Sequence, residues 1–324
     1  MTHRPGRFKR GFTGQFPSFG LRGNPHSRQQ FHKGGREGRV TGNGRNSEGY
    51  ALLSPTLAVM GLALIAPVVL LIVTSLKTQT GISFEAGWTL AQYGEVLGRG
   101  SYRTLFLRSL LISGLVTLIT ILLAYPMAYF VAFHARRKFL WLIALTIPFW
   151  TSYLLRVFAW KTILGFNGVI NSGLERLGLI DQPLSFLLYN PFAVVVTLAH
   201  AWAAFAILPI YVSLEKIDRS LLEAASDLGD GTLRRFLRIT LPLSMPGVIG
   251  AAILIFVPTT GDFVTPELVG GPAGAMIANI IEVQFSQVGN WPLGAALALT
   301  SMVLVGVIAG LFVSAARAAT RVVR

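Results

Sequence analysis

The chain has 324 residues, of which 52% are hydrophobic and only 13% are charged, and its formal net charge at pH 7 is +14. A soluble domain of this size carries about 25% charged residues, so the shortfall indicates a surface that faces lipid rather than water. The sequence contains no cysteine, which excludes disulfides, thiolate zinc sites and cysteine nucleophiles. Its five histidines show no ligand-like spacing, and we expect no metal site.

Residues 1–50 are strongly basic, with ten Lys or Arg residues against the two acids Glu37 and Glu48. This segment is rich in Gly, Arg, Asn and Gln, a composition typical of a disordered tail. It lacks the short apolar core of a secretory signal peptide. We expect either a tail that is attracted to anionic lipid or RNA, or a solvated tail that only helps to set the topology. A start site assigned too far upstream is a third alternative.

Six segments after the tail have the roughly 20 largely apolar residues that a transmembrane helix requires. They are residues 54–76, 109–133, 139–161, 192–213, 247–265 and 293–315. Proline and glycine breaks in the third and fifth segments predict irregular helices inside a bundle, because only neighbouring helices or a cavity can satisfy the freed backbone groups. The sequence therefore predicts an all-α integral membrane fold in which residues 51–324 form a six-span domain.

Lys and Arg residues are distributed unequally between the two sides of the predicted bundle. One side collects 21 of them from the tail and from residues 134–140, 214–246 and 316–324. The opposite side collects only five. The positive-inside rule places the richer side in the cytoplasm, so we expect both termini to be cytoplasmic.

The cytoplasmic loop 215–246, between the fourth and fifth spans, begins with a predicted short helix. The stretch Ser220–Leu228 carries apolar residues at helical spacing. Ser220 precedes Glu223 by three residues, which is the spacing of a capping box. Gly229 is suited to the left-handed conformation that ends a helix, so we expect the chain to bend there.

A second short helix is predicted over residues 232–239, and we expect Leu241–Pro242 to end it. Two short helices joined by a bend would form a rigid lever tied to two spans. The chain has no glycine-rich phosphate loop followed by Lys and Ser or Thr, and we expect it to lack an ATP site of its own. The sequence thus predicts a membrane protein without catalytic residues and without a cofactor, rather than an enzyme.

The loop resembles the coupling motif of ABC importer permeases at every defining position and at both spacings. The matching residues are Glu223, Ala224, Ala225, Gly229, Ile239, Leu241 and Pro242. In that family the motif forms a coupling helix that docks in a groove of the ATP-hydrolysing subunit. The resemblance implies that Glu223 contacts the ATPase and that Gly229 allows the bend. The alternative is an ordinary amphipathic cytoplasmic hairpin.

Residues 52–315 also resemble the permeases of spermidine/putrescine importers. The stretches that carry this resemblance are PFWTSYLLRVFAW (148–160), NGVIN (167–171), LGLIDQPL (177–184), GDFVTPELVGGP (261–272) and the WP pair at 291–292. The resemblance implies a type I ABC importer permease in the bacterial inner membrane. Its partners would be a second permease, an external substrate-binding protein and two ATPase subunits that bind ATP and Mg, and no nucleic acid is expected.

Other solutes remain open for the same subunit type, namely iron, sulfate, or an opine or amino-acid-like compound. A secondary transporter would show internal repeats and several mid-membrane charges, and a six-span membrane enzyme or sensor would show a cluster of catalytic side chains at one depth. The sequence shows neither pattern, so both classes are disfavoured.

Five residues are candidates for the substrate path. A flexible polycation needs carboxylates and aromatic faces to replace its water. Asp262 lies in the outer part of the fifth span and Glu267 follows it, while Trp150 and Tyr153 line the third span. We expect Arg156, in the same span, either to pair with Asp262 or to extend to the outer face. Aromatic residues near a membrane interface can also be simple anchors.

Overall fold

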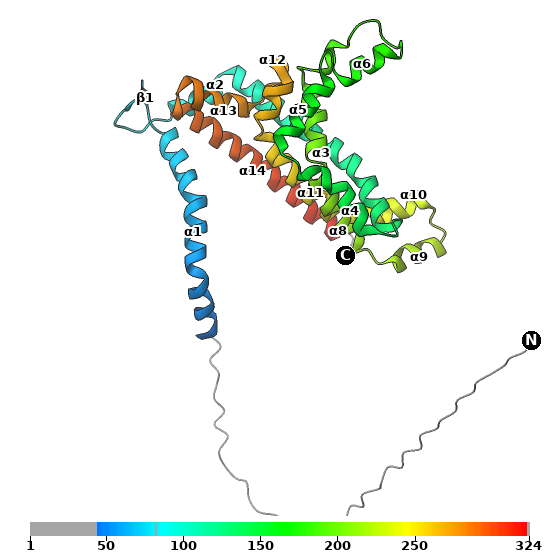
Figure 1. Ribbon diagram of the computed structural model, residues 1–324. Coiled ribbons are helices and arrows are strands. Elements are labelled where there is room, and N and C mark those ends of the chain that lie inside the picture. The colour runs from blue at the N-terminus through cyan, green and yellow to red at the C-terminus, as the bar shows by residue number, and fades with distance from the viewer. Residues whose placement is uncertain (1–43, 82, 323–324) are drawn as a thin grey trace, which may run out of the picture. The chain divides into compact units, whose positions relative to one another are not determined.

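The computed structural model describes residues 44–81 and 83–322, with side chains for residues 53–81 and 83–314. Its internal contacts divide the chain after Ala58, and the description below concerns the part from Val59 onward together with the helix that leads into it. The elements are shown in Figure 1.

In the first half of the chain the elements are α1 (Gly44–Ser75), β1 (Gln79–Thr80), β2 (Ser83–Phe84), α2 (Ala91–Gly98), α3 (Gly100–Phe133), α4 (Lys138–Thr146), the 3₁₀ turn η1 (Ile147–Trp150), α5 (Tyr153–Leu164) and α6 (Val169–Arg176). In the second half they are the 3₁₀ turn η2 (Ser185–Leu187), α7 (Pro191–Ala201), α8 (Ala203–Glu215), α9 (Arg219–Asp227), α10 (Thr232–Arg235), the π-helical turn η3 (Phe236–Thr240), α11 (Leu241–Thr260), the π-helical turn η4 (Pro266–Gly270), α12 (Gly271–Gly274), α13 (Ile277–Val283), the π-helical turn η5 (Gln284–Val288) and α14 (Trp291–Val322). The two short strands pair antiparallel, with Gln79 opposite Phe84.

The predicted basic tail lies almost entirely outside the described residues, and its disorder therefore stays a prediction. Helix α1 begins at Gly44, so residues 44–50 are helical where the sequence predicts disorder. The physical reason is that a stable helix extends cheaply at its end, since each added residue fixes one backbone conformation and gains one hydrogen bond.

Within the described residues, four helices are long and apolar enough to cross a membrane, and the number rises to seven if each of three bent helix pairs is one span. The four helices are Leu53–Ser75, Gly100–Phe133, Thr232–Thr260 and Trp291–Ser314. The bent pairs are Lys138–Trp150 with Tyr153–Arg176 at 84°, Pro191–Ala201 with Ala203–Glu215 at 48°, and Pro266–Gly274 with Ile277–Val288 at 108°. The six predicted spans fall on the four helices and the first two pairs.

The breaks lie partly where the sequence predicts them. The third span is broken directly after Trp150, where the 3₁₀ turn that contains Pro148 ends. The fourth span is broken at Trp202, which the sequence does not predict. The fifth span stays helical through Pro258 and ends at Thr260. The third bent pair occupies a stretch that we expected to be an external loop.

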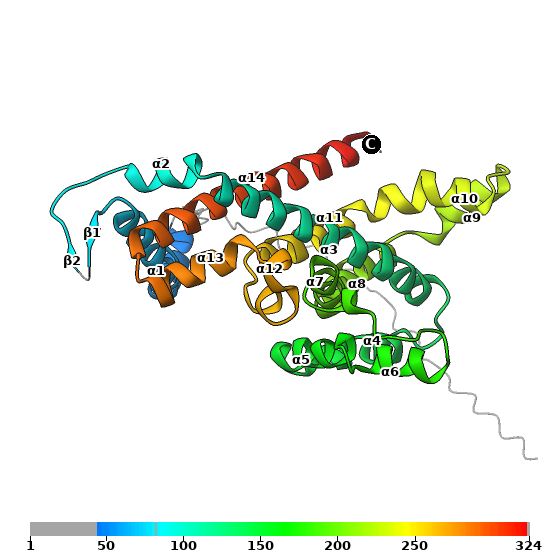
Figure 2. The same ribbon diagram turned by 90° about the horizontal axis from the view of Figure 1, so that it is seen from above.

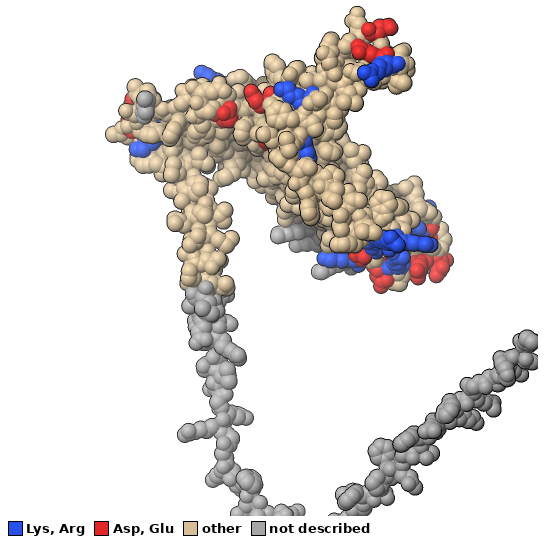
Figure 3. Space-filling model, in the orientation of Figure 1, with Lys and Arg blue, Asp and Glu red and all other residues tan. Residues whose placement is uncertain are grey.

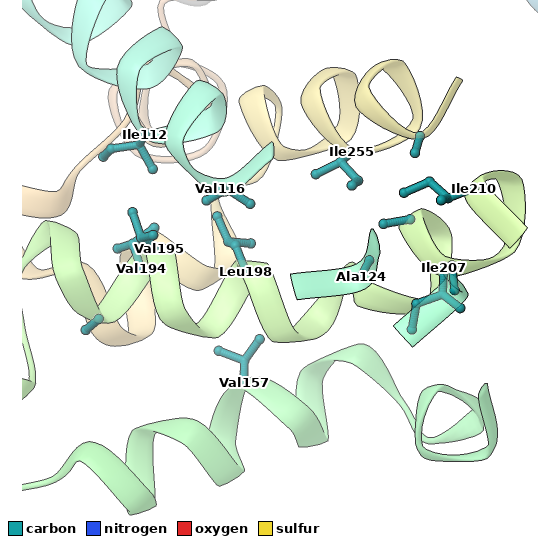
Figure 4. Close-up of a cluster of buried hydrophobic side chains, with 14 of the residues drawn as sticks. Ile112, Val116, Ala124, Val157, Val194, Val195, Leu198, Ile207, Ile210 and Ile255 are labelled. Atoms are coloured by element: carbon teal, nitrogen blue, oxygen red, sulfur yellow. The ribbon is translucent and has the colours of Figure 1, made fainter. Parts of the chain in front are cut away.

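Buried side chains of α3, α7, α8 and α11 form the main core (Figure 4). Val116, Leu198, Ile210 and Ile255 are almost fully buried there, and Val157 packs onto the same cluster from α5. Figure 2 shows α7 and α8 between α3 on one side and α4 and α5 on the other. Such dense packing of apolar and small residues is how helices associate in lipid, where no hydrophobic driving force acts between them.

Gly247 lies at a close contact between α11 and α8. A Cβ atom at this position would collide with the backbone oxygen of Pro209 and with the side chain of Ser213. Only a glycine therefore lets the two helices pack at this distance. This contact matters for the site below, because α11 connects the loop 215–246 to Asp262.

Charged side chains gather at the ends of the helices rather than along them. Figure 3 shows Lys, Arg, Asp and Glu over α9 and α10 and again over α6, with a largely uncharged surface between them. Many large apolar side chains on that surface are exposed, such as Leu111 at 72% and Leu107 at 61%. In water this would be unfavourable, whereas a bilayer solvates such a surface.

Candidate functional site

The N-cap of helix α9 lies two residues before Ser220, the N-cap that the sequence predicts. Its N-cap is Asp218, whose Oδ1 accepts a hydrogen bond from the backbone N–H of Ser220 at 2.9 Å. The predicted capping box with Ser220 as N-cap is therefore wrong: Asp218 and Ser220 are both good caps, and the extended backbone of Asp218 decides between them. The bond from the Ser220 N–H favours the carboxylate and lowers the pKa of Asp218.

The end of α9 follows the sequence prediction for Gly229. This residue has a φ of +85°, in the left-handed region that glycine adopts without steric cost. The Gly229 N–H donates to Ser226 O at 3.0 Å, and the Asp230 N–H donates to Ala225 O at 2.9 Å. These two bonds satisfy carbonyls that the helix end would leave unpaired, so the bend has one defined geometry.

Polar side chains tie α9 to α10 on the far side of the bend. Asp230 lies 3.8 Å from Arg234 and 3.6 Å from Arg238, measured between carboxylate oxygen and guanidinium nitrogen. Arg235 donates from Nη1 to Ser226 Oγ at 2.5 Å. Ser226 belongs to α9 and Asp230 to the bend, whereas the three arginines belong to α10 and η3. These contacts therefore connect the two helical segments on either side of the bend.

The expectation that Leu241–Pro242 ends the second helix is wrong. Helices α10, η3 and α11 follow one another without a break, and Thr232–Thr260 forms one stretch of 29 residues. The Leu241 N–H donates to Phe236 O, five residues earlier. A π-helical turn of this kind shifts the hydrogen-bond register just before Pro242, which can neither donate nor tolerate the carbonyl four residues back. The loop is thus continuous with the fifth span.

The seven residues of the coupling motif divide into an exposed and a packed group. Glu223, Ala224 and Gly229 are exposed, and Ala225 is buried beneath them. The other three, Ile239, Leu241 and Pro242, are half-buried where α11 begins. The motif therefore has an exposed part on α9 and a packed part at the start of α11.

The exposed face of the loop carries large apolar side chains beside charges of both signs. Leu228 is 88% exposed and Leu233 is 72% exposed. Next to them lies a hollow of about 610 Å³ whose lining includes Leu237, Arg234 and Arg238. Exposed leucines rimmed by charges mark surfaces that other proteins cover, and this one lies where the charge count predicts the cytoplasm.

A second polar site lies between α5 and the end of α11. The Tyr153 hydroxyl is hydrogen-bonded to Asp262 Oδ2 and lies 2.5 Å from Thr265 Oγ1. The other carboxylate oxygen of Asp262 accepts the backbone N–H groups of Val264 at 2.9 Å and Thr265 at 3.4 Å. Asp262 therefore caps the turn that follows α11 and at the same time joins it to α5.

Arg156 lies near this group but does not pair with it, so the expected ion pair with Asp262 is not formed among the described residues. Its guanidinium carbon lies 5.2 Å from the centre of the Phe149 ring. The Nε and Nη1 atoms are buried and have no hydrogen-bond partner in the part of the chain that the structure describes. The residue as a whole is half-buried, and the alternative, in which Arg156 extends to the outer face, stays a prediction.

A cavity of about 370 Å³ brings part of the predicted substrate path together. It is lined by Tyr153, Arg156, Ala201, Trp202, Phe205, Pro258 and Asp262. Trp202, at the break in the fourth span, was not predicted, and its Nε1 is likewise buried and without a partner among the described residues. The place of Trp202 in the cavity depends on how three spans pack together, which the sequence alone does not show.

Two predicted path residues lie elsewhere. Trp150 is 85% exposed on η1, and Glu267 is exposed on η4, where its Oε2 accepts a bond from Asn279 Nδ2 at 3.4 Å. Neither lines the cavity of about 370 Å³. The structure thus assembles Tyr153, Arg156 and Asp262 into one site and separates Trp150 and Glu267 from it.

Comparisons with known proteins agree with one another. Residues 87–318 match the family described as "Binding-protein-dependent transport system inner membrane component". The chain is 38% identical over 243 residues to the spermidine/putrescine transport system permease protein PotB of Escherichia coli K12, a match that covers 74% of this chain and 87% of PotB. It is 35% identical to PotB of Haemophilus influenzae, with 75% of this chain and 85% of that protein covered.

A crystal structure of a bacterial ABC transporter that imports the acidic polysaccharide alginate contains a chain of similar fold. The TM-score is 0.67 at 19% sequence identity, and the match covers 84% of this chain and 96% of that chain. At this level of identity the likeness concerns the fold alone, which is that of an ABC importer permease.

Proposed function

Because the chain belongs to the family of inner membrane components of binding-protein-dependent transport systems, we propose that it is a permease subunit through which an ATP-driven importer takes up a polyamine such as spermidine or putrescine. The assignment of a polyamine as the cargo rests on the 38% identity to PotB over 87% of that protein's length. The cavity with Asp262 supports it, since a carboxylate is the group that a polycation needs along its path.

The loop between α8 and α11 is the proposed docking surface for the ATPase subunit. Exposed Glu223, Ala224 and Leu228 would face the ATPase, and the uninterrupted helix Thr232–Thr260 would carry the motion inward. At 1.5 Å per residue this helix is about 43 Å long, enough to cross the bilayer. A push on α9 would therefore act on the turn that holds Asp262.

The proposed assembly follows from the missing ATP motif and from the family. The chain would work with a second permease, two ATPase subunits that bind ATP and Mg, and an external binding protein that delivers the cargo. Both termini and the loop would be cytoplasmic, as the distribution of Lys and Arg predicts. Transport would proceed by alternating access, with the loop following closure of the ATPase subunits.

Uptake of radiolabelled spermidine by cells that depend on this importer tests the proposal. Glu223→Lys and Gly229→Asp are expected to abolish uptake while membrane insertion, followed by immunoblot of the membrane fraction, stays unchanged. Glu175→Lys on α6 is a matched control, because it makes the same charge change far along the chain from the loop. Normal uptake in the two loop variants would refute the coupling role. Uptake that iron, sulfate or amino acids compete away, but polyamines do not, would refute the cargo.

A further inference from the structure

The cavity at the end of α11 contains two charges of opposite sign that do not neutralise each other. Arg156 and Asp262 both line this space of about 370 Å³. The carboxylate is held by neutral donors, namely the Tyr153 hydroxyl and the N–H groups of Val264 and Thr265. The guanidinium rests beside Phe149, with Nε and Nη1 unpaired among the described residues.

A guanidinium with two buried nitrogens that lack a hydrogen-bond partner among the described residues is a costly arrangement at membrane depth. A buried donor without an acceptor loses the hydrogen bonds it had in water, and a buried charge loses more. Costly local arrangements of this kind cluster at ligand sites and at switch regions, where they are part of the mechanism. The acceptor that shares the cavity is Asp262, so the cost in this conformation indicates where Arg156 binds in another one.

We propose that Arg156 alternates between the face of Phe149 and an ion pair with Asp262, and that it competes there with the cationic cargo. The inference rests on the proposed polyamine cargo and names the residue that releases it. An ammonium group bound to a buried carboxylate alone would leave slowly, whereas transport requires a site that is weak enough to empty. Arg156 returning to Asp262 displaces the ammonium group and resets the site.

An arginine side chain is suited to both proposed positions, the face of Phe149 and the carboxylate of Asp262. A guanidinium stacks on aromatic rings and also forms bidentate pairs with carboxylates, which a lysine ammonium does less well. Tyr153 keeps Asp262 oriented in both cases, because a neutral hydroxyl donor leaves the negative charge available to either cation. The cavity between the two positions leaves room for the side chain to move.

The surrounding helices are broken where the exchange requires movement. Arg156 lies in the first turn of α5, directly after the 84° bend of the third span, and Trp202 lies at the 48° bend of the fourth. Asp262 follows the end of the helix that begins at the cytoplasmic loop. Bends of this kind are where domains and helices reorient, so a push on the loop can change the distance between Arg156 and Asp262.

Release of spermidine from the complete transporter tests the proposal. The complex, purified with its natural partners in lipid nanodiscs, is loaded with radiolabelled spermidine and arrested with ATP and vanadate, and loss of label is followed over time. We expect Arg156→Gln to slow release about tenfold, which corresponds to roughly 1.4 kcal/mol. Arg156→Lys is expected to restore most of the rate. Lys161→Gln, which removes a charge from the same helix outside the cavity, is the control and should release at the wild-type rate.

The decisive comparison is the same substitution in an Asp262→Asn background. If Arg156 acts by displacing cargo from the carboxylate, Arg156→Gln has no further effect there. Equal slowing in both backgrounds, or release at the wild-type rate by Arg156→Gln, would overturn the proposal.

A cargo-free measurement separates this inference from the proposed function. The ATPase rates of Arg156→Gln, Asp262→Asn and the double variant are compared without spermidine, and exchange between the two residues predicts that the double variant equals one of the singles. If the wild-type complex retains no spermidine, the proposed cargo is refuted, and so is the proposed competition between Arg156 and that cargo. Non-additive ATPase rates would in that case still place Arg156 on Asp262, and additive rates would refute the exchange itself.

Discussion

The hydroxyl of Tyr153 donates a hydrogen bond to the carboxylate of Asp262, and this bond joins the first residue of α5 to the turn that ends α11. The same carboxylate caps that turn through the N–H of Val264. The third and fifth spans are therefore connected through polar groups just after the end of the helix Thr232–Thr260.

Loss of the Tyr153 hydroxyl is expected to weaken both stability and transport. Tyr153→Phe removes a hydrogen bond to a charged acceptor, which contributes about 1.5–3 kcal/mol, and leaves Asp262 without that donor. The thermal unfolding temperature of the complex should fall, with lower spermidine uptake. Tyr129→Phe is the matched control, since the contacts of Tyr129 with Phe133 and Phe236 are those of its ring. An equal loss in both variants would contradict a specific role for the bond.

The conformation of Gly229 should decide which substitutions the loop tolerates. Gly229→Ala forces a side chain into the left-handed region at a cost of about 1–2 kcal/mol, although no atom lies within 4 Å of its added Cβ. Gly229→Asn should retain most uptake, because Asn adopts this region more readily. Spermidine uptake normalised to membrane content measures both. The reverse order, with Ala better than Asn, would show that space rather than backbone conformation constrains the position.

Packing at Gly247 should make it intolerant of any larger residue. Gly247→Val would press α11 away from Pro209 and Ser213, and overpacking of this kind costs about 1–3 kcal/mol. Thermal unfolding of the complex in detergent should show a lower midpoint. Gly250→Val, on the same helix with nothing within 4 Å of an added Cβ, should leave the midpoint near that of the wild type. Similar midpoints for both variants would mean that the two helices are free to separate.

Asp218 should make the start of α9 sensitive to acid. The Ser220 N–H holds the pKa of this carboxyl below its usual value of 3.8. The cap is therefore fully present above that value, and it is lost as the pH falls through the lower pKa of the folded state. Hydrogen exchange in the peptide that spans α9 should quicken in that acidic range. In Asp218→Asn, which still caps but does not titrate, the exchange should not depend on this group, and in Asp218→Ala it should be fast at every pH.

Much of the loop could be predicted because its signals are local. The apolar spacing of Leu221, Leu222 and Ala225 sets a helix, and Gly229 ends it in the conformation that its missing side chain allows. The spans follow from the length of apolar stretches alone. Two local predictions were wrong. Asp218 and not Ser220 is the N-cap of α9, because both residue types cap helices well. The second helix continues past Pro242 after a π-helical turn.

The cavity could not be predicted, because its members come from three spans. Arg156, Trp202 and Asp262 are far apart in the chain, and no periodicity relates them. The sequence by itself determined the membrane-spanning class, the bend at Gly229 and the presence of two opposite charges, Arg156 and Asp262, in the predicted spans. Only the tertiary structure decided that Tyr153 and not Arg156 binds Asp262, because that choice depends on how closely α5, α8 and α11 pack.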